Sequence, residues 1–207
     1  MPLPAPTDRE HLHTRTLDLR GYARSDGLFD IEGRLTDTKG YAFQSLWRGE
    51  MKPGMAVHGM ALRLTLDDTH LIREVEACID DSPFEMCPQA APNFKALVGI
   101  RMGPGWRKKA RELLGGTRGC THLLEMLGQM ATVAFQTIHP YKMRTGQIEE
   151  KDPARAKAMR SFMIDSCLSW DSKGPVVRRL IPDAYTGDDP PENTPGDSGA
   201  DPEDQGA

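Results

Sequence analysis

The chain has 207 residues, of which 38% are hydrophobic and 27% are charged, and its formal net charge at pH 7 is −4. This length supports one well-buried core, whereas two full domains would each be undersized. No apolar stretch approaches the roughly 20 residues that span a bilayer, and the first eight residues lack the pattern of a secretory signal. We therefore expect a cytoplasmic protein that does not bind a membrane.

The charges are unevenly distributed along the chain. Residues 187–207 contain seven acidic residues and no lysine or arginine, so the other residues have 26 basic and 23 acidic side chains. This small positive excess suits a small anionic ligand, because nucleic-acid binding requires a concentrated basic face. Composition also predicts a flexible N-terminus over 1–10, a single domain over 11–185 and a disordered acidic tail over 186–207.

The first half of the domain has the pattern of an antiparallel sheet. Alternating residues predict strands over 14–23 and 28–36, joined by a turn-forming cluster that ends at Gly27. A polar loop over about 37–54 leads to a second hairpin, with strands over 57–66 and 71–79. The sheet is therefore expected to have about four strands, arranged as two hairpins.

Helical patterns replace this alternation after residue 79. Pro92 suits a first helical turn and predicts a helix over 91–98, and a second helix is predicted over 106–114. The longest helix is expected over 121–138, where apolar residues recur every three or four positions. A helix over 153–163 and an extended segment over 172–180 follow. The predicted fold is α+β, with the sheet packed against three to four C-terminal helices.

Cys120 directly precedes the longest predicted helix. The positive end of the helix dipole favours a thiolate there, which would ligate a metal or act as a nucleophile. His122 follows two residues later, and such residues converge only if Cys120 lies in the turn before the helix. The alternative is a buried core cysteine beside a histidine with which it shares no role.

Other cysteines extend this pattern. A cytosolic chain of this size keeps its cysteines reduced, and Cys87, like Cys120, lies just before a predicted helix. Thiolates together with His122 favour zinc or iron over magnesium, although the chain has no Cys-x-x-Cys pair. Asp37, at the end of the second strand, is either a further ligand or base, or a turn residue. Cys78 lies within a strand pattern and is assigned to the core.

Residues 103–109 place free backbone amides and cationic side chains at a helix start, which favours a bound anion. Arg107 would hold a carboxylate or phosphate there, with Trp106 beside it. The alternative is a solvated basic helix face with Trp106 packed inward.

Several strings in the chain resemble an uncharacterised bacterial family, domain of unknown function 2889. They are DGLFDIEG at 26–33, LTDTK at 35–39, RMGPGWR at 101–107 and LLGGTRGCTH at 113–122. The likeness covers about residues 12–182, and it implies bacterial origin and a shared fold, with no settled activity.

A fainter resemblance is to iron–sulfur scaffolds of the NifU type. In those proteins a cysteine begins the helix after a hairpin, and a His-Cys pair begins the last core helix. Cys87 and the pair Cys120 and His122 follow the hairpin in the same order along this chain. However, the scaffolds' Cys-Gly-Asp loop is missing here, and the pair is reversed with one residue inserted. Asp37 is only a positional substitute for the missing loop.

Two functions are therefore predicted. The first is a small metal- or iron–sulfur-binding protein whose ligands are Cys87, Cys120 and His122, with Asp37 as an additional ligand. The alternative is a metal-free lyase or hydrolase that acts on a small anionic aromatic or acyl compound through Cys120 and His122, with Trp106 and Arg107 binding the substrate.

Overall fold

The computed structural model describes residues 3–148 and 163–187, and the chain divides into two compact units, residues 1–150 and 151–207. The helix predicted over 153–163 falls almost entirely outside the described residues, as does most of the acidic tail predicted from residue 186. The single domain predicted over 11–185 stays a prediction. Among the described residues, no helix is long and apolar enough to cross a bilayer.

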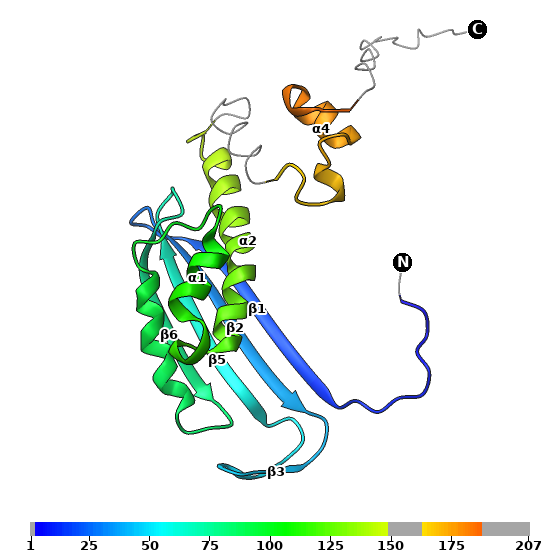
Figure 1. Ribbon diagram of the computed structural model, residues 1–207, viewed down its shortest axis with the longest axis vertical. Coiled ribbons are helices and arrows are strands. Elements are labelled where there is room, and N and C mark those ends of the chain that lie inside the picture. Colours follow the sequence, from blue (N-terminus) through cyan, green and yellow to red (C-terminus); the bar gives the residue numbers. More distant parts are fainter. Residues whose placement is uncertain (1–2, 149–162, 188–207) are drawn as a thin grey trace, which may run out of the picture. The chain divides into compact units, whose positions relative to one another are not determined.

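The first unit is built on a four-stranded antiparallel sheet with strand order β1-β2-β5-β6 (Figure 1). Its strands are β1 (His13–Ala23), β2 (Phe29–Lys39), β5 (Ala56–Leu66) and β6 (Ile72–Asp81). Gly27 has a φ of 84° in the turn between β1 and β2, a conformation that glycine adopts without strain. In the turn between β5 and β6, the Asp67 carboxylate accepts hydrogen bonds from the backbone N–H groups of Thr69 and Leu71. Both predicted hairpins are confirmed.

The segment predicted as a polar loop over 37–54 contains regular structure. β2 continues to Lys39, and a small separate hairpin follows, formed by β3 (Phe43–Ser45) and β4 (Gly49–Met51). Strands of three residues are too short to show alternation, which is why the pattern did not reveal them. The pairing of β2 with β5 has a register shift between Asp37 and Thr38, where β5 contains one extra residue, Val57.

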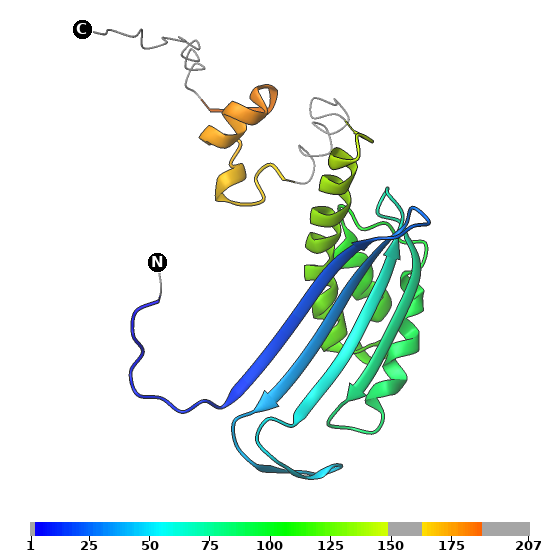
Figure 2. The same ribbon diagram turned by 180° about the vertical axis from the view of Figure 1, so that it is seen from behind.

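Within residues 3–148, helices cover one face of the sheet and none covers the other, which we call the bare face (Figures 1 and 2). The covering elements are the 3-10 helix η1 (Cys87–Leu97), α1 (Trp106–Leu114), the short η2 (Gly116–Arg118) and α2 (Thr121–Arg144). The α+β prediction and the helix over 106–114 are confirmed. The segment predicted as a helix over 91–98 is instead part of η1, because Pro92 lies inside the segment and lacks the N–H group that a regular α-helix requires there.

The core lies between the covered face of the sheet and the helices, and it includes buried leucines of β5 and the apolar stripe of α2. α2 approaches β1 so closely at Gly21 that a Cβ atom there would overlap the side chain of Thr137. α2 also extends beyond the predicted end at 138, because Pro140 lies in its last turns and removes only one backbone donor.

The bare face of the sheet is polar, with charged side chains in rows across the strands. Arg63 pairs there with Glu32 and Glu76 from the two neighbouring strands. Cys78 is exposed on this face, because the alternation of β6 directs its neighbours Ala77 and Ile79 toward the core. The prediction that Cys78 belongs to the core is therefore wrong.

The second unit contains η3 (Leu168–Trp170), α4 (Pro175–Leu180) and η4 (Pro182–Ala184). Val177 of α4 is fully buried, and the Arg178 guanidinium lies 5.9 Å from the centre of the Tyr185 ring. The prediction of an extended segment over 172–180 is wrong, because Pro175 begins a helix, a position where its missing N–H costs nothing.

Candidate functional site

A row of polar residues lies at one end of the core-facing side of the sheet. The strand register places Arg15 of β1 beside Asp37 of β2, and Asp37 beside His58 of β5. Asp37 continues the alternation of Ile31 and Leu35, which are buried in the core, so the backbone directs its carboxylate to the same side. Asp37 is 1% exposed and is one of two buried polar residues among those the structure describes.

The Asp37 carboxylate accepts four hydrogen bonds. Its Oδ1 accepts from His13 Nε2 at 3.0 Å and from Arg15 Nε at 2.9 Å, and its Oδ2 accepts from Arg15 Nη2 at 2.8 Å and His58 Nδ1 at 3.0 Å. The Arg15 guanidinium, assisted by His13 and His58, holds the pKa of the Asp37 carboxyl well below its usual value despite burial. Asp37 is therefore ionised at neutral pH and can only accept hydrogen bonds, so His58 Nδ1 is the donor in the bond between the two residues.

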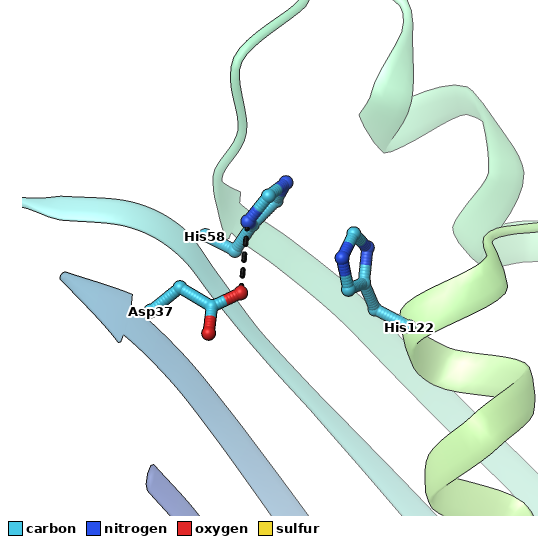
Figure 3. A group of neighbouring side chains, drawn as sticks. All are labelled: Asp37, His58 and His122. Atoms are coloured by element: carbon cyan, nitrogen blue, oxygen red, sulfur yellow. Dashed lines mark hydrogen bonds and ion pairs between the residues drawn. The ribbon is translucent and has the colours of Figure 1, made fainter. Parts of the chain in front are cut away.

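α2 adds His122 to this row from above the sheet (Figure 3). The rings of His58 and His122 have centroids 4.2 Å apart and are tilted by 41°. Burial lowers the pKa of His122, and the nearby His58 and Arg15 lower it further. His122 is therefore neutral at neutral pH, the form in which histidine binds metal or acts as a base.

Asp37, His58 and His122 each offer one ligand atom, and these atoms all lie within 4.8 Å of one another. Among residues 3–148 and 163–187, this is the one group of three or more histidine, cysteine or acidic side chains with the spacing of a metal site. The group joins two strands and a helix, so its geometry depends on the packing of α2 against the sheet.

Cys120 lies at the edge of this group. It is the N-cap of α2 and has an extended backbone, with φ −101° and ψ 128°, so it lies in the turn before the helix. Its Sγ atom is 3.9 Å from His122 Nδ1. The two side chains can converge because Cys120 lies outside the helix; residues two apart within a helix point in different directions.

The other predicted site residues lie elsewhere in the first unit. Cys87 begins η1 and packs half-buried against the core, and it does not belong to the group around Asp37. Trp106 is 4% exposed, and both Trp106 and Arg107 line a hollow of about 230 Å³ between α1 and α2. The Arg107 side chain lies over Gly128 of α2: a Cβ atom added to Gly128 would be 3.4 Å from Arg107 Nε. This hollow is not lined by Asp37, His58 or His122.

The sequence reasoning missed His58, Arg15 and His13. Their signal is the strand register: once the turn at Gly27 fixes the first hairpin, counting back along both strands places Arg15 opposite Asp37. His58 is harder to find, because the β3–β4 hairpin and the extra residue in β5 separate it from Asp37.

A family model described as a protein of unknown function, DUF2889, matches residues 13–136. The chain belongs to the DUF2889 family. The matched region runs from β1 into α2, and it contains all of Asp37, His58, Cys120 and His122. No curated protein and no solved structure matches the chain. The fainter likeness to NifU-type scaffolds therefore stays a prediction.

Proposed function

We propose that this DUF2889 protein binds a divalent transition metal, zinc or ferrous iron, through Asp37, His58 and His122. The observation that carries this proposal is the approach of one ligand atom from each residue to within 4.8 Å of the others, around a buried carboxylate. Two imidazoles and one carboxylate are ligands that both metals accept, and they leave coordination positions open for water or a substrate.

The surroundings of the three residues favour this role. His122 is neutral at neutral pH, so protons do not compete strongly for its lone pair. Arg15 and His13 hold Oδ1 of Asp37, which fixes the orientation of the carboxylate in the way that outer-shell partners fix metal ligands. We propose the Cys120 thiol, which lies outside the group of three but 3.9 Å from His122 Nδ1, as a fourth ligand of the soft type that zinc and iron favour. Cys87 is left out of this ligand set.

Metal analysis tests the proposal. Untagged protein purified without air is expected to contain, or to take up on titration, about one zinc or iron ion per chain. His58→Ala and His122→Ala are expected to lower the metal affinity at least about tenfold. His139→Ala is the matched control, because it changes the same residue type on α2 far from the group. Absence of saturable zinc and ferrous-iron binding by the wild-type protein would overturn the proposal.

Cobalt substitution tests the role of Cys120. A thiolate bound to Co²⁺ gives an intense near-ultraviolet absorption, which Cys120→Ser is expected to remove while the weaker visible bands remain. If the near-ultraviolet absorption is already missing from the wild-type protein, Cys120 is not a ligand, and the metal site consists of Asp37, His58 and His122 alone.

A second candidate function is a metal-free enzyme with Cys120 as the nucleophile. The contact between Cys120 Sγ and His122 Nδ1 supports it, because a neutral histidine accepts the thiol proton and so generates the thiolate. Its substrate would be a small anionic acyl or aromatic compound. This function predicts fast alkylation of Cys120 by iodoacetamide in the presence of a chelator, and slower alkylation in His122→Ala. Equal rates in the two proteins would exclude it.

A cytoplasmic location is part of the proposal. The four free cysteines, Cys78, Cys87, Cys120 and Cys167, support it, because free thiols persist in reducing compartments.

A further inference from the structure

β1 is an edge strand whose outer side has no backbone partner within residues 3–148. It has 11 residues, contains no proline and pairs with β2 without a register shift. Proteins usually protect such an edge with a bulge, a proline or a covering element. β6, at the opposite edge, has this protection, since its pairing with β5 shifts register twice and η1 packs against it. β1 is thus a long, regular edge that can accept a further strand.

The backbone groups on this edge can be assigned from the hairpin. A hydrogen bond from Arg24 N–H to the Leu28 carbonyl, 2.8 Å long, closes the turn, so the backbone of Arg24 faces β2. Residues of an antiparallel strand alternately face their partner strand and face away from it. Leu17, Leu19 and Gly21 therefore direct their N–H and C=O groups away from β2, toward the free side.

The charges of β1 favour a two-fold axis at Leu19 over an axis at either neighbouring residue when the strand pairs with an identical antiparallel strand. Asp18 and Arg20 point to the bare face of the sheet, where they form a bidentate ion pair with each other. A two-fold axis at Leu19 places Asp18 of each copy opposite Arg20 of the other. An axis at Asp18 or at Arg20 places like charges directly opposite each other, which destabilises pairing.

The same register suits the apolar side of the strand. Leu17 and Leu19 are only partly buried where they pack at the rim of the core. With the axis at Leu19, the two copies of Leu19 lie opposite each other, and each Leu17 lies opposite Gly21 of the second copy. Both leucines then gain cover, and the core becomes continuous across the new strand pair.

We propose that the protein forms a two-fold symmetric dimer in which β1 pairs with β1 of a second copy, centred on Leu19. The two four-stranded sheets then form one continuous eight-stranded sheet. The occupant of the edge is a second copy because one register satisfies the outward backbone groups, the charges and the partly buried leucines together.

Mass measurement and directed cross-linking of the full chain test the dimer. Light scattering at about 50 µM, a concentration well above a dissociation constant of about 1 µM, is expected to give twice the chain mass of 23.0 kDa. Leu19→Cys is expected to form an intermolecular disulfide under mild oxidation, because facing Cα atoms of a hydrogen-bonded pair are about 5.5 Å apart. Tyr22→Cys is the matched control, since its two copies would be about 20 Å apart.

The wild-type protein under the same oxidant measures the background from its own exposed thiols, Cys78 and Cys167. Leu19→Lys places two ammonium groups face to face, so it is expected to weaken the dimer at least about tenfold while the chain still unfolds cooperatively. A monomeric mass overturns the proposal. This is also the result expected if another part of the same chain covers β1. A dimer in which Leu19→Cys cross-links no more than Tyr22→Cys also overturns it.

Discussion

The substitution Asp37→Asn keeps the size of the side chain at the centre of the site and removes its charge. The wild-type carboxylate accepts two hydrogen bonds from Arg15 and one each from His13 and His58. An asparagine amide accepts hydrogen bonds at only one of its two terminal atoms, and its NH₂ group would face donors. The substitution therefore leaves the Arg15 guanidinium without its counter-charge and breaks at least part of the network.

The cost lies between two limits. Removing one partner of a fully buried ion pair costs about 3–5 kcal/mol, whereas an exposed pair contributes about 0–1 kcal/mol. The side chain of Asp37 is 2% exposed and that of Arg15 is 41% exposed, so water can partly solvate Arg15 after the substitution. We therefore expect the free energy of unfolding at pH 7 to fall by about 2–3 kcal/mol.

Urea denaturation of the wild-type and variant proteins measures this change. Asp26→Asn is the matched control, because Asp26 and Arg24 have the same bidentate geometry in the turn between β1 and β2, where the Asp26 side chain is 47% exposed. The control is expected to lose much less stability than Asp37→Asn. Equal losses in the two variants would refute the reasoning, because burial would then not be what makes the Asp37 network stabilising.

Three further predictions follow from the same structure. The folded-state pKa of Asp37 is lowered from 3.8, so the ionised carboxylate stabilises the fold fully well above pH 3.8 and progressively less below it. The difference in the free energy of unfolding between wild type and Asp37→Asn should therefore shrink between pH 4 and pH 2 in urea titrations. The folded-state pKa of His122 is lowered from 6.5, so the unfolded state binds a proton first as pH falls. The free energy of unfolding of the wild-type protein should therefore decrease from pH 7 toward pH 5, and His122→Gln should show a smaller decrease. Gly21→Ala forces β1 away from α2 and should lower the free energy of unfolding by about 1–3 kcal/mol; adding Thr137→Ala should restore part of that loss, and no recovery would mean that the overlap is not the cause.

Most of the fold could be predicted because its signals are local. Alternation and turn residues define both hairpins of the main sheet, and the apolar stripe of α2 defines the longest helix. The errors fall where local signals are weak or ambiguous. β3 and β4 are too short to show a period, and Pro175 marks the start of a helix in a segment that was expected to be extended.

The site was predicted only in part, because its residues meet through strand register and helix packing. Cys120 and His122 are close in sequence, and the helix start explains their contact. Asp37 was identified only by its place at the end of a strand, which did not indicate that it is buried and holds Arg15 and His58. Those contacts depend on pairings between distant segments, and a single sequence specifies such pairings only when the turn between them is recognised.

The extra residue in β5 has a practical consequence for protein engineering. This residue, Val57, directly precedes His58, which pairs with Asp37, and the β3–β4 hairpin precedes β5 in the chain. A bulge absorbs differences in chain length without rotating the residues before it, so the tip of this hairpin, where Leu46 is 88% exposed, can be lengthened while Asp37 keeps its orientation. The hairpin is therefore a suitable place to insert a fluorescent reporter or an affinity handle close to the site.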